Sequence, residues 1–103
     1  MRGKMTKKEL ESLLLDSLGI TETFAESASK SLSECRDSSI ASAVIEYAQK
    51  GNETYLEKNG YNTDILQKEY DMDYLNAALM IAWLETDPMT AKSALDAGYD
   101  DVW

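Results

Sequence analysis

The sequence has no histidine, one cysteine and one proline among its 103 residues. Without histidine, the chain lacks the commonest general base and the commonest transition-metal ligand of proteins. A lone cysteine, Cys35, excludes an intramolecular disulfide and a zinc site built from several cysteines, and it favours a reducing compartment. With one proline and five glycines, the chain is also not a proline-rich linker, a collagen-like strand or a loop-dominated fold.

Positive charge is also scarce, because ten Lys and Arg residues face nineteen Asp and Glu residues and the net charge is −9. Four of the positive charges lie within the first eight residues. From Glu69 to the end, eight acidic residues accompany Lys92 as the one base. Direct binding to nucleic acid or to an anionic membrane surface requires a basic face. We therefore expect neither a nucleic-acid ligand nor a membrane partner.

Long apolar runs are missing as well. The longest extends from Ala77 to Leu84, eight residues, whereas a bilayer-spanning helix needs about 20. A signal peptide would follow the basic N-terminus with an uninterrupted apolar stretch, but Glu9 and Glu11 intervene here. The sequence predicts a cytoplasmic protein, and it leaves open whether Met1 or Met5 is the native start.

The clearest positive signals are those that start and stop helices. Thr6 followed three residues later by Glu9 predicts a capping box, and Gly19 follows at the expected end of that helix. Thr23 and Glu26 repeat the capping-box pattern for a second helix. Similar signals predict three further helices, bounded by Asp37 or Ser38 and Gly51, by Glu53 and Gly60, and by Thr63 or Asp64 and Tyr70.

The segment from Tyr74 to Leu84 (residues 74–84) is the most hydrophobic of the chain and is interrupted only by Asn76. A helix that is apolar on all sides is normally the buried centre of a bundle, which places Trp83 in the core. Two alternatives remain open for residues 65–85: one bent helix, or two helices, of which Asp71 or Asp73 caps the second. Asp87 followed by Pro88 predicts the start of a last helix that runs to Gly98.

These patterns predict an all-α fold, a compact bundle of five to seven short helices around a central apolar helix of residues 74–84. We expect residues 1–103 to form a single helical domain, with residues 1–5 flexible and residues 99–103 as a C-terminal tail. Cys35 ends the apolar stripe of the second helix. Because a nucleophilic cysteine needs a histidine or an electropositive surround, we expect Cys35 to be a small core residue.

The acidic residues do not form a recognisable catalytic or metal-binding motif. Glu69, Asp71 and Asp73 alternate before the central helix, but the EF-hand pattern of glycine and glutamate is absent, and helix capping accounts for aspartates at this place. Nineteen acids make some close pair inevitable, and there is no phosphate-binding glycine loop or nucleophile elbow. We therefore expect a protein that is not an enzyme and that uses no cofactor and no metal.

The charge distribution favours a small acidic protein-binding module whose partner presents a basic surface. Such a module could inhibit its partner by occupying a nucleic-acid-binding surface, and its size and charge have the general character of phage-type anti-restriction and anti-CRISPR proteins. Tyr and Trp are favoured anchors at interfaces, and Trp103 either packs on the bundle or forms a free docking tail. The candidate partner-binding residues are Glu69, Asp71, Asp73, Asp100, Asp101 and Trp103.

Two alternative functions follow from other features of the sequence. The apolar segment 74–84 is large for a domain of this size to cover alone, which favours a self-associating helical assembly subunit, so a homo-oligomer is an alternative state. The acidic cluster at residues 69–73 favours a module that binds a divalent cation.

Overall fold

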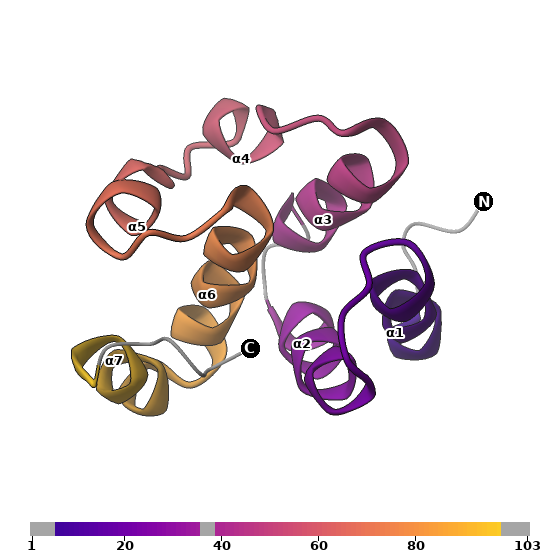
Figure 1. The fold of residues 1–103 in the computed structure, drawn as a ribbon, viewed down its shortest axis with the longest axis horizontal. Helices are drawn as coiled ribbons and strands as arrows, with labels where there is room; N and C mark the ends of the chain where they lie inside the picture. Colours follow the sequence, from indigo (N-terminus) through magenta and orange to yellow (C-terminus); the bar gives the residue numbers. More distant parts are fainter. Residues whose placement is uncertain (1–5, 36–38, 98–103) are drawn as a thin grey trace.

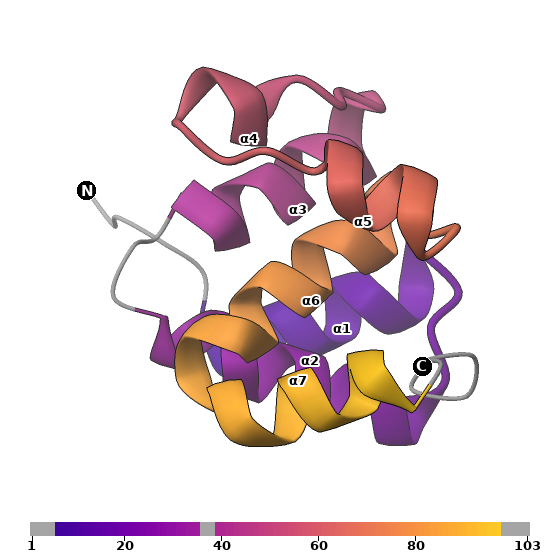
Figure 2. The same ribbon diagram turned by 90° about the vertical axis from the view of Figure 1, so that its left-hand side faces the viewer.

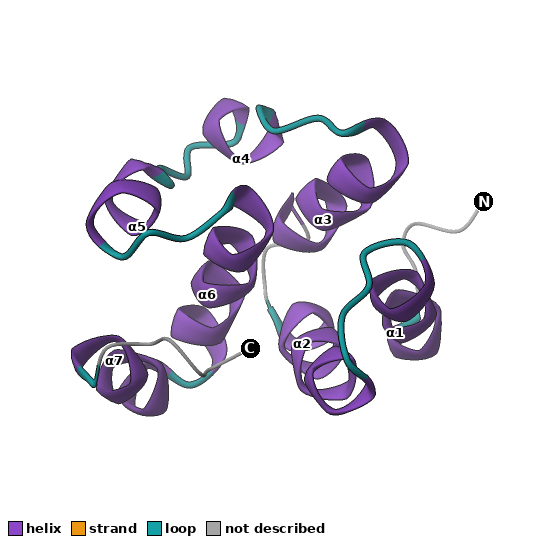
Figure 3. Cartoon of the chain, in the orientation of Figure 1, coloured by secondary structure: helices purple, strands orange, loops and turns teal. Residues whose placement is uncertain are grey.

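The computed structural model describes residues 6–35 and 39–97, which form seven α-helices and no strand (Figures 1 and 3). This confirms the predicted all-α bundle, at the upper end of the expected number of helices. The helices are α1 (Lys7–Asp16), α2 (Glu22–Glu34), α3 (Ser39–Lys50), α4 (Tyr55–Lys58), α5 (Asp64–Glu69), α6 (Tyr74–Thr86) and α7 (Pro88–Asp96).

Most helix ends lie where the sequence places them. Thr6 caps α1 in a capping box, in which the Glu9 N–H donates to Thr6 Oγ1 at 3.2 Å and the Thr6 N–H donates to Glu9 Oε1 at 2.8 Å. Asp87 caps α7, and Pro88 occupies its first position. Gly51 and Gly60 follow α3 and α4 with φ angles of 68° and 90°, a backbone conformation that favours glycine.

The start of α2 differs from the prediction. The helix begins at Glu22 with Thr21 as N-cap, so Thr23 lies inside the first turn and does not cap it. The Ala25 N–H donates to the Thr21 carbonyl at 2.8 Å, and Ala25 is fully buried while Phe24 is only partly buried. Burial of the Ala25 face therefore sets where this helix begins, and the local capping pattern of Thr23 and Glu26 does not.

Residues 64–86 form two helices, which settles the alternative that the sequence left open. The chain turns at Asp71, whose φ of 56° lies in the left-handed region, and the Met72 N–H donates back to the Leu66 carbonyl at 3.3 Å. Asp73 then caps α6, and its Oδ1 accepts a hydrogen bond from the Asn76 N–H at 2.8 Å. A bent continuous helix is excluded, because residues 70–73 leave the helical path.

Helix α6 lies at the centre of the bundle, as expected from its sequence. It packs against α2, α3, α5 and α7, whereas α1 reaches the bundle through α2 and α3 (Figures 1 and 2). Its buried residues surround the helix axis: Tyr74, Leu75, Ala77, Ala78, Leu79, Met80 and Ala82. No helix within residues 6–35 and 39–97 is long and apolar enough to cross a membrane.

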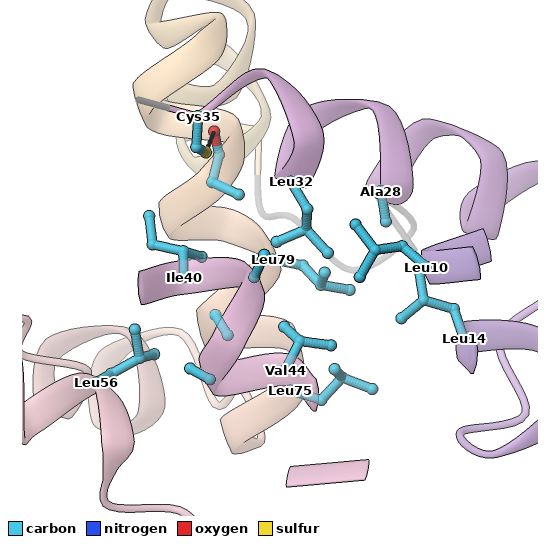
Figure 4. Close-up of a cluster of buried hydrophobic side chains, with 14 of the residues drawn as sticks. Leu10, Leu14, Ala28, Leu32, Cys35, Ile40, Val44, Leu56, Leu75 and Leu79 are labelled. Carbon is cyan, nitrogen blue, oxygen red and sulfur yellow. Dashed lines mark hydrogen bonds between the residues drawn. The ribbon is translucent and has the colours of Figure 1, made fainter. Parts of the chain in front are cut away.

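The buried apolar side chains form two clusters that share α6. The larger joins α1, α2, α3 and α4 to one side of α6, with Leu10, Leu32, Val44 and Leu79 among its members (Figure 4). The smaller joins α5 and α7 to the other side of α6, and its buried members are Leu66, Met72, Ala77, Met80 and Ala91.

Two expected core residues have different environments. Cys35 is buried, and its thiol donates a long hydrogen bond of 3.7 Å to the Ala82 carbonyl of α6, which confirms its place in the core (Figure 4). Trp83 is only partly buried and packs at the edge of the smaller cluster. The prediction of a core tryptophan was therefore only partly right, because α5 and α7 leave part of α6 uncovered.

Candidate functional site

The acidic side chains of the bundle lie almost entirely on its surface. Of the sixteen acidic residues in the described part of the chain, fourteen are exposed, while Glu11 and Glu46 are half-buried. The seven lysines of the same residues are all exposed. Within the described residues, exposed carboxylates therefore outnumber exposed ammonium groups by two to one, and the surface that these residues form is negative.

The three acidic residues at the α5–α6 junction have separate structural environments. Glu69 ends α5, Asp71 makes the left-handed turn, and Asp73 caps α6; all three are exposed. In residues 6–35 and 39–97, no three His, Cys, Asp or Glu side chains are placed to hold a metal ion together. The arrangement thus explains Asp71 and Asp73 by local backbone geometry and gives no support to the divalent-cation alternative.

The other candidate residues cannot be placed. Asp100, Asp101 and Trp103 lie outside the described residues, as do Asp37 and Ser38, the expected caps of α3. The same holds for residues 1–5, for Gly98 and for the tail of residues 99–103. The roles expected for these residues stay predictions.

A polar cleft opens between α4, α5 and the start of α6. Its volume is about 370 Å³, and its lining residues are Glu53, Glu57, Gly60, Tyr61, Asn62, Thr63, Asp64, Gln67 and Tyr74. Most of these residues belong to the segment that carries α4 and α5; α4 lies above α3 and α6, and α5 lies beside the start of α6 (Figures 1 and 2). The cleft thus combines three carboxylates with hydroxyl and amide groups.

The wall of the cleft is shaped by turns between α4 and α5. Gly60 ends α4 with a positive φ, and the Tyr61 N–H then donates to the Leu56 carbonyl at 2.9 Å. The Asn62 side chain accepts from the Asp64 N–H at 2.8 Å, which fixes the entry to α5. These local hydrogen bonds set the backbone positions of Asn62 and Asp64 in the wall.

Tyr74 is the buried residue among those that line the cleft. The residue is 4% exposed, its ring lies 5.4 Å from the ring of Tyr47, and its hydroxyl accepts from the Leu56 N–H at 3.5 Å. Burial raises the pKa of the Tyr74 hydroxyl above its ordinary value, and the negative charge of Glu53 acts in the same direction, while the Leu56 N–H opposes them. Tyr74 therefore stays protonated at neutral pH and can donate a hydrogen bond.

Outside the cleft, one carboxylate is held by its neighbours. Asn52 Nδ2 donates to Glu46 Oε1 at 3.3 Å, and Lys50 Nζ lies 3.4 Å from Glu46 Oε2. The Asn52 hydrogen bond lowers the pKa of Glu46, the charge of Lys50 adds to this, and burial opposes both. This side chain is already engaged within the protein, in contrast to most of the acidic surface.

Glu53, Glu57 and Asp64 were not among the predicted site residues, because they are distributed over twelve residues that include the loop before α4, α4 itself and the start of α5. The usable signal was the polar loop Gly60–Tyr61–Asn62 between two short acidic helices, since irregular segments at a surface often carry binding residues. The loop alone does not show that Tyr74, ten or more residues further on, completes the cleft.

Comparisons with known proteins give no further assignment. No protein-family model matches the chain. No curated protein and no solved structure matches it either. The site therefore has to be interpreted from its own geometry and charge.

Proposed function

We propose that the protein is a small non-enzymatic binding module that acts in the cytoplasm and docks on a basic surface of a partner protein. The observation that carries this proposal is the excess of exposed carboxylates: fourteen, against seven exposed lysines, in the described residues. A negative surface accelerates encounter with a positive partner and rejects negatively charged competitors. Where the partner's basic surface binds nucleic acid, the protein would inhibit that binding by occupying the phosphate positions.

The geometry gives less support to catalysis. The chain has no histidine, and no nucleophile–base pair is found among the hydrogen bonds of the described residues. A nucleophile activated by a neighbouring base is the usual sign of acyl-transfer or hydrolytic chemistry. Cys35, the one thiol, is buried and donates to the Ala82 carbonyl, an environment that does not favour a nucleophile. A binding role is the simpler proposal.

Salt dependence and charge removal together test the proposal. Tagged protein is used to capture partners at about 0.05 M and at about 0.5 M salt. The screening length exceeds about 10 Å at the lower concentration and is well below about 10 Å at the higher one. We expect nucleic-acid-binding proteins to be released at the higher salt. Purified partner is then tested for displacement from nucleic acid. Retention of all partners at high salt would contradict a surface that works by charge.

A charge-removing variant makes the test specific to the junction of α5 and α6. We choose Glu69→Gln, Asp71→Asn and Asp73→Asn in one chain, because asparagine at position 73 keeps an oxygen that caps α6. Partner affinity is expected to fall while the melting temperature changes little. Unchanged affinity would remove these three residues from the interface.

Self-association is a second candidate function, favoured by a specific observation. Two large apolar side chains are exposed on the helices that flank α6: Ile65 on α5 is 59% exposed and Met89 on α7 is 82% exposed. Together with the partly covered Trp83, they leave apolar surface beside α6 that a second copy could bury. Sedimentation velocity over a hundredfold range of protein concentration tests this second candidate function. A monomer at all concentrations would contradict self-association.

A further inference from the structure

The cleft between α4, α5 and α6 is negative where the structure describes it. Among the described residues, its lining includes Glu53, Glu57 and Asp64 but no lysine or arginine, although α4 and α5 carry Lys58 and Lys68. Within residues 6–35 and 39–97, none of these three carboxylates accepts a hydrogen bond or forms an ion pair. The negative charge of this lining is therefore available to a cationic group from outside the protein.

A buried hydroxyl in the same cleft points independently to a ligand. Tyr74 is 4% exposed and lines the cleft, and its oxygen accepts the Leu56 N–H at 3.5 Å. Its hydroxyl hydrogen has no acceptor among the described residues. Buried hydroxyl groups normally donate as well as accept, so a ligand that presents an acceptor can take the Tyr74 proton in place of water.

The lining of the cleft therefore favours a ligand that carries two kinds of chemical group. The three carboxylates favour a positive charge, while the Tyr74 hydroxyl favours a neutral acceptor such as a carbonyl oxygen. A lysine or arginine residue in a peptide carries both, because its side chain is cationic and its main chain presents carbonyl groups. A simple metal ion or polyamine carries the first property only.

The size and polarity of the cleft agree with such a ligand. Its volume of about 370 Å³ lies near the lower end of the roughly 300–1,000 Å³ range of ligand pockets. Pockets for drug-like molecules are mostly lined by apolar and aromatic side chains, whereas six of the nine lining residues here are charged, amide or hydroxyl residues other than tyrosine. This lining suits a polar peptide segment.

We propose that this cleft binds a lysine- or arginine-containing peptide segment of the partner, with the cationic head group at Glu53, Glu57 and Asp64 and a main-chain carbonyl on the Tyr74 hydroxyl. The proposal rests on the proposed function, which it deepens by naming the anchor point on the acidic surface. The remaining exposed carboxylates then provide a negative electrostatic potential around the cleft. The cleft itself determines which residue of the partner is inserted.

Nuclear magnetic resonance titration of the isotope-labelled full chain tests the proposal. The probes are blocked tripeptides, acetyl-Gly-Lys-Gly-amide and its arginine counterpart, at about 0.02 M salt, with norleucine in place of lysine as the uncharged control. We expect saturable shifts at the amides of residues 60–67. The Leu56 amide should also move, because its N–H is bonded to the Tyr74 hydroxyl. Equal shifts with the norleucine peptide would overturn the proposal.

Two variants of equal charge assign the binding to the cleft. The cleft variant carries Glu53→Gln, Glu57→Gln and Asp64→Asn. The control variant removes three exposed carboxylates from α2 instead, at Glu22, Glu26 and Glu34. The dissociation constant of the lysine peptide is expected to rise at least about tenfold in the cleft variant and less than about twofold in the control, since Coulomb attraction falls with distance and is screened by salt.

A third variant, Tyr74→Phe, tests the acceptor part of the proposal. It removes the hydroxyl and leaves the three carboxylates, so the peptide should bind more weakly while spermidine, a cation without a carbonyl, should bind as before. Spermidine binding as tightly as the lysine peptide to the unmodified protein would overturn the peptide assignment. Thermal unfolding of each variant confirms that a loss of binding does not reflect a loss of fold.

The two proposals fail in different ways. Equal weakening in the cleft and control variants, with shifts spread over the whole acidic surface, would overturn the cleft as an anchor but leave the charge-driven function intact. No shift with either cationic peptide would overturn the cleft. If the captured partners are also insensitive to salt, the proposed function fails with it.

Discussion

Asp73 is both the cap of α6 and one of the exposed acidic residues proposed to face the partner, and two substitutions separate these properties. Asp73→Ala removes the oxygen that accepts from the Asn76 N–H at 2.8 Å, together with the charge. Asp73→Asn removes the charge but keeps an oxygen in the same place, because asparagine is as good an N-cap as aspartate. The difference between the two variants isolates the capping hydrogen bond.

The expected magnitude follows from the place of α6 in the fold. Loss of an N-cap costs about 0.5–2 kcal/mol, typically about 1. Since α6 contributes to both apolar clusters, its start cannot fray without loosening both. For a domain of about 100 residues, 1 kcal/mol lowers the melting temperature by about 4–8 °C. Asp73→Asn loses only the charge–dipole interaction, about 0.3–1 kcal/mol, and is expected to melt closer to the unmodified protein.

Thermal unfolding followed by circular dichroism at 222 nm measures both variants, with salt-dependent partner binding as the second measurement. We expect Asp73→Ala to lose stability and affinity, and Asp73→Asn to lose mainly affinity. If Asp73→Asn melted as low as Asp73→Ala, the negative charge and not the hydrogen bond would be what Asp73 contributes to α6. If neither variant melted lower, the capping argument itself would be refuted.

Three further substitutions test the core, a turn and the cleft. Leu79→Ala, at a side chain that is 1% exposed, is expected to lower the free energy of unfolding by about 2–5 kcal/mol in urea titration; a loss below 1 kcal/mol would show a loosely packed centre. Gly60→Ala meets no atom within 4 Å but keeps a φ of 90°, so we expect a loss of about 1–2 kcal/mol from backbone strain alone. Because burial raises the pKa of Tyr74 above 10.0, the stability it contributes is complete below about pH 10 and falls as the pH rises through its folded-state pKa. Tyr74→Phe should therefore lose less stability than the unmodified protein between pH 9 and pH 11, and identical pH profiles would contradict the raised pKa.

Much of the architecture could be predicted from local chemistry. The Thr6–Glu9 capping box and the Asp87–Pro88 start depend on groups within three residues of each other, so the sequence contains the whole interaction. The central place of α6 was equally clear from its composition, because a helix with no polar face has to be covered on every side.

The features that sequence analysis missed depend on contacts between distant segments. The start of α2 is set by burial of Ala25 against the rest of the larger cluster, which overrides the Thr23–Glu26 pattern. The partial exposure of Trp83 depends on how much of α6 is covered by α5 and α7, and no local pattern encodes that coverage.

The partner-binding role of Glu69, Asp71 and Asp73 stays a prediction, although all three are exposed. The sequence also offered capping as an explanation for the aspartates, and Asp73 does cap α6. The left-handed turn at Asp71 was not predicted. The cleft itself joins Glu53 to Tyr74 across two short helices and the loops that connect them, and such irregular backbone is the part of a fold that periodicity describes least.

The division of the buried side chains into two clusters has a consequence for how the bundle opens. The smaller cluster attaches α5 and α7 to α6 through only a few buried side chains, so we expect these two helices to separate from α6 before the larger cluster opens. Proteins commonly open in such cooperative sub-units, whose free energies lie below that of global unfolding. Since α5 forms one wall of the cleft, we expect local opening of α5 to widen the cleft without global unfolding.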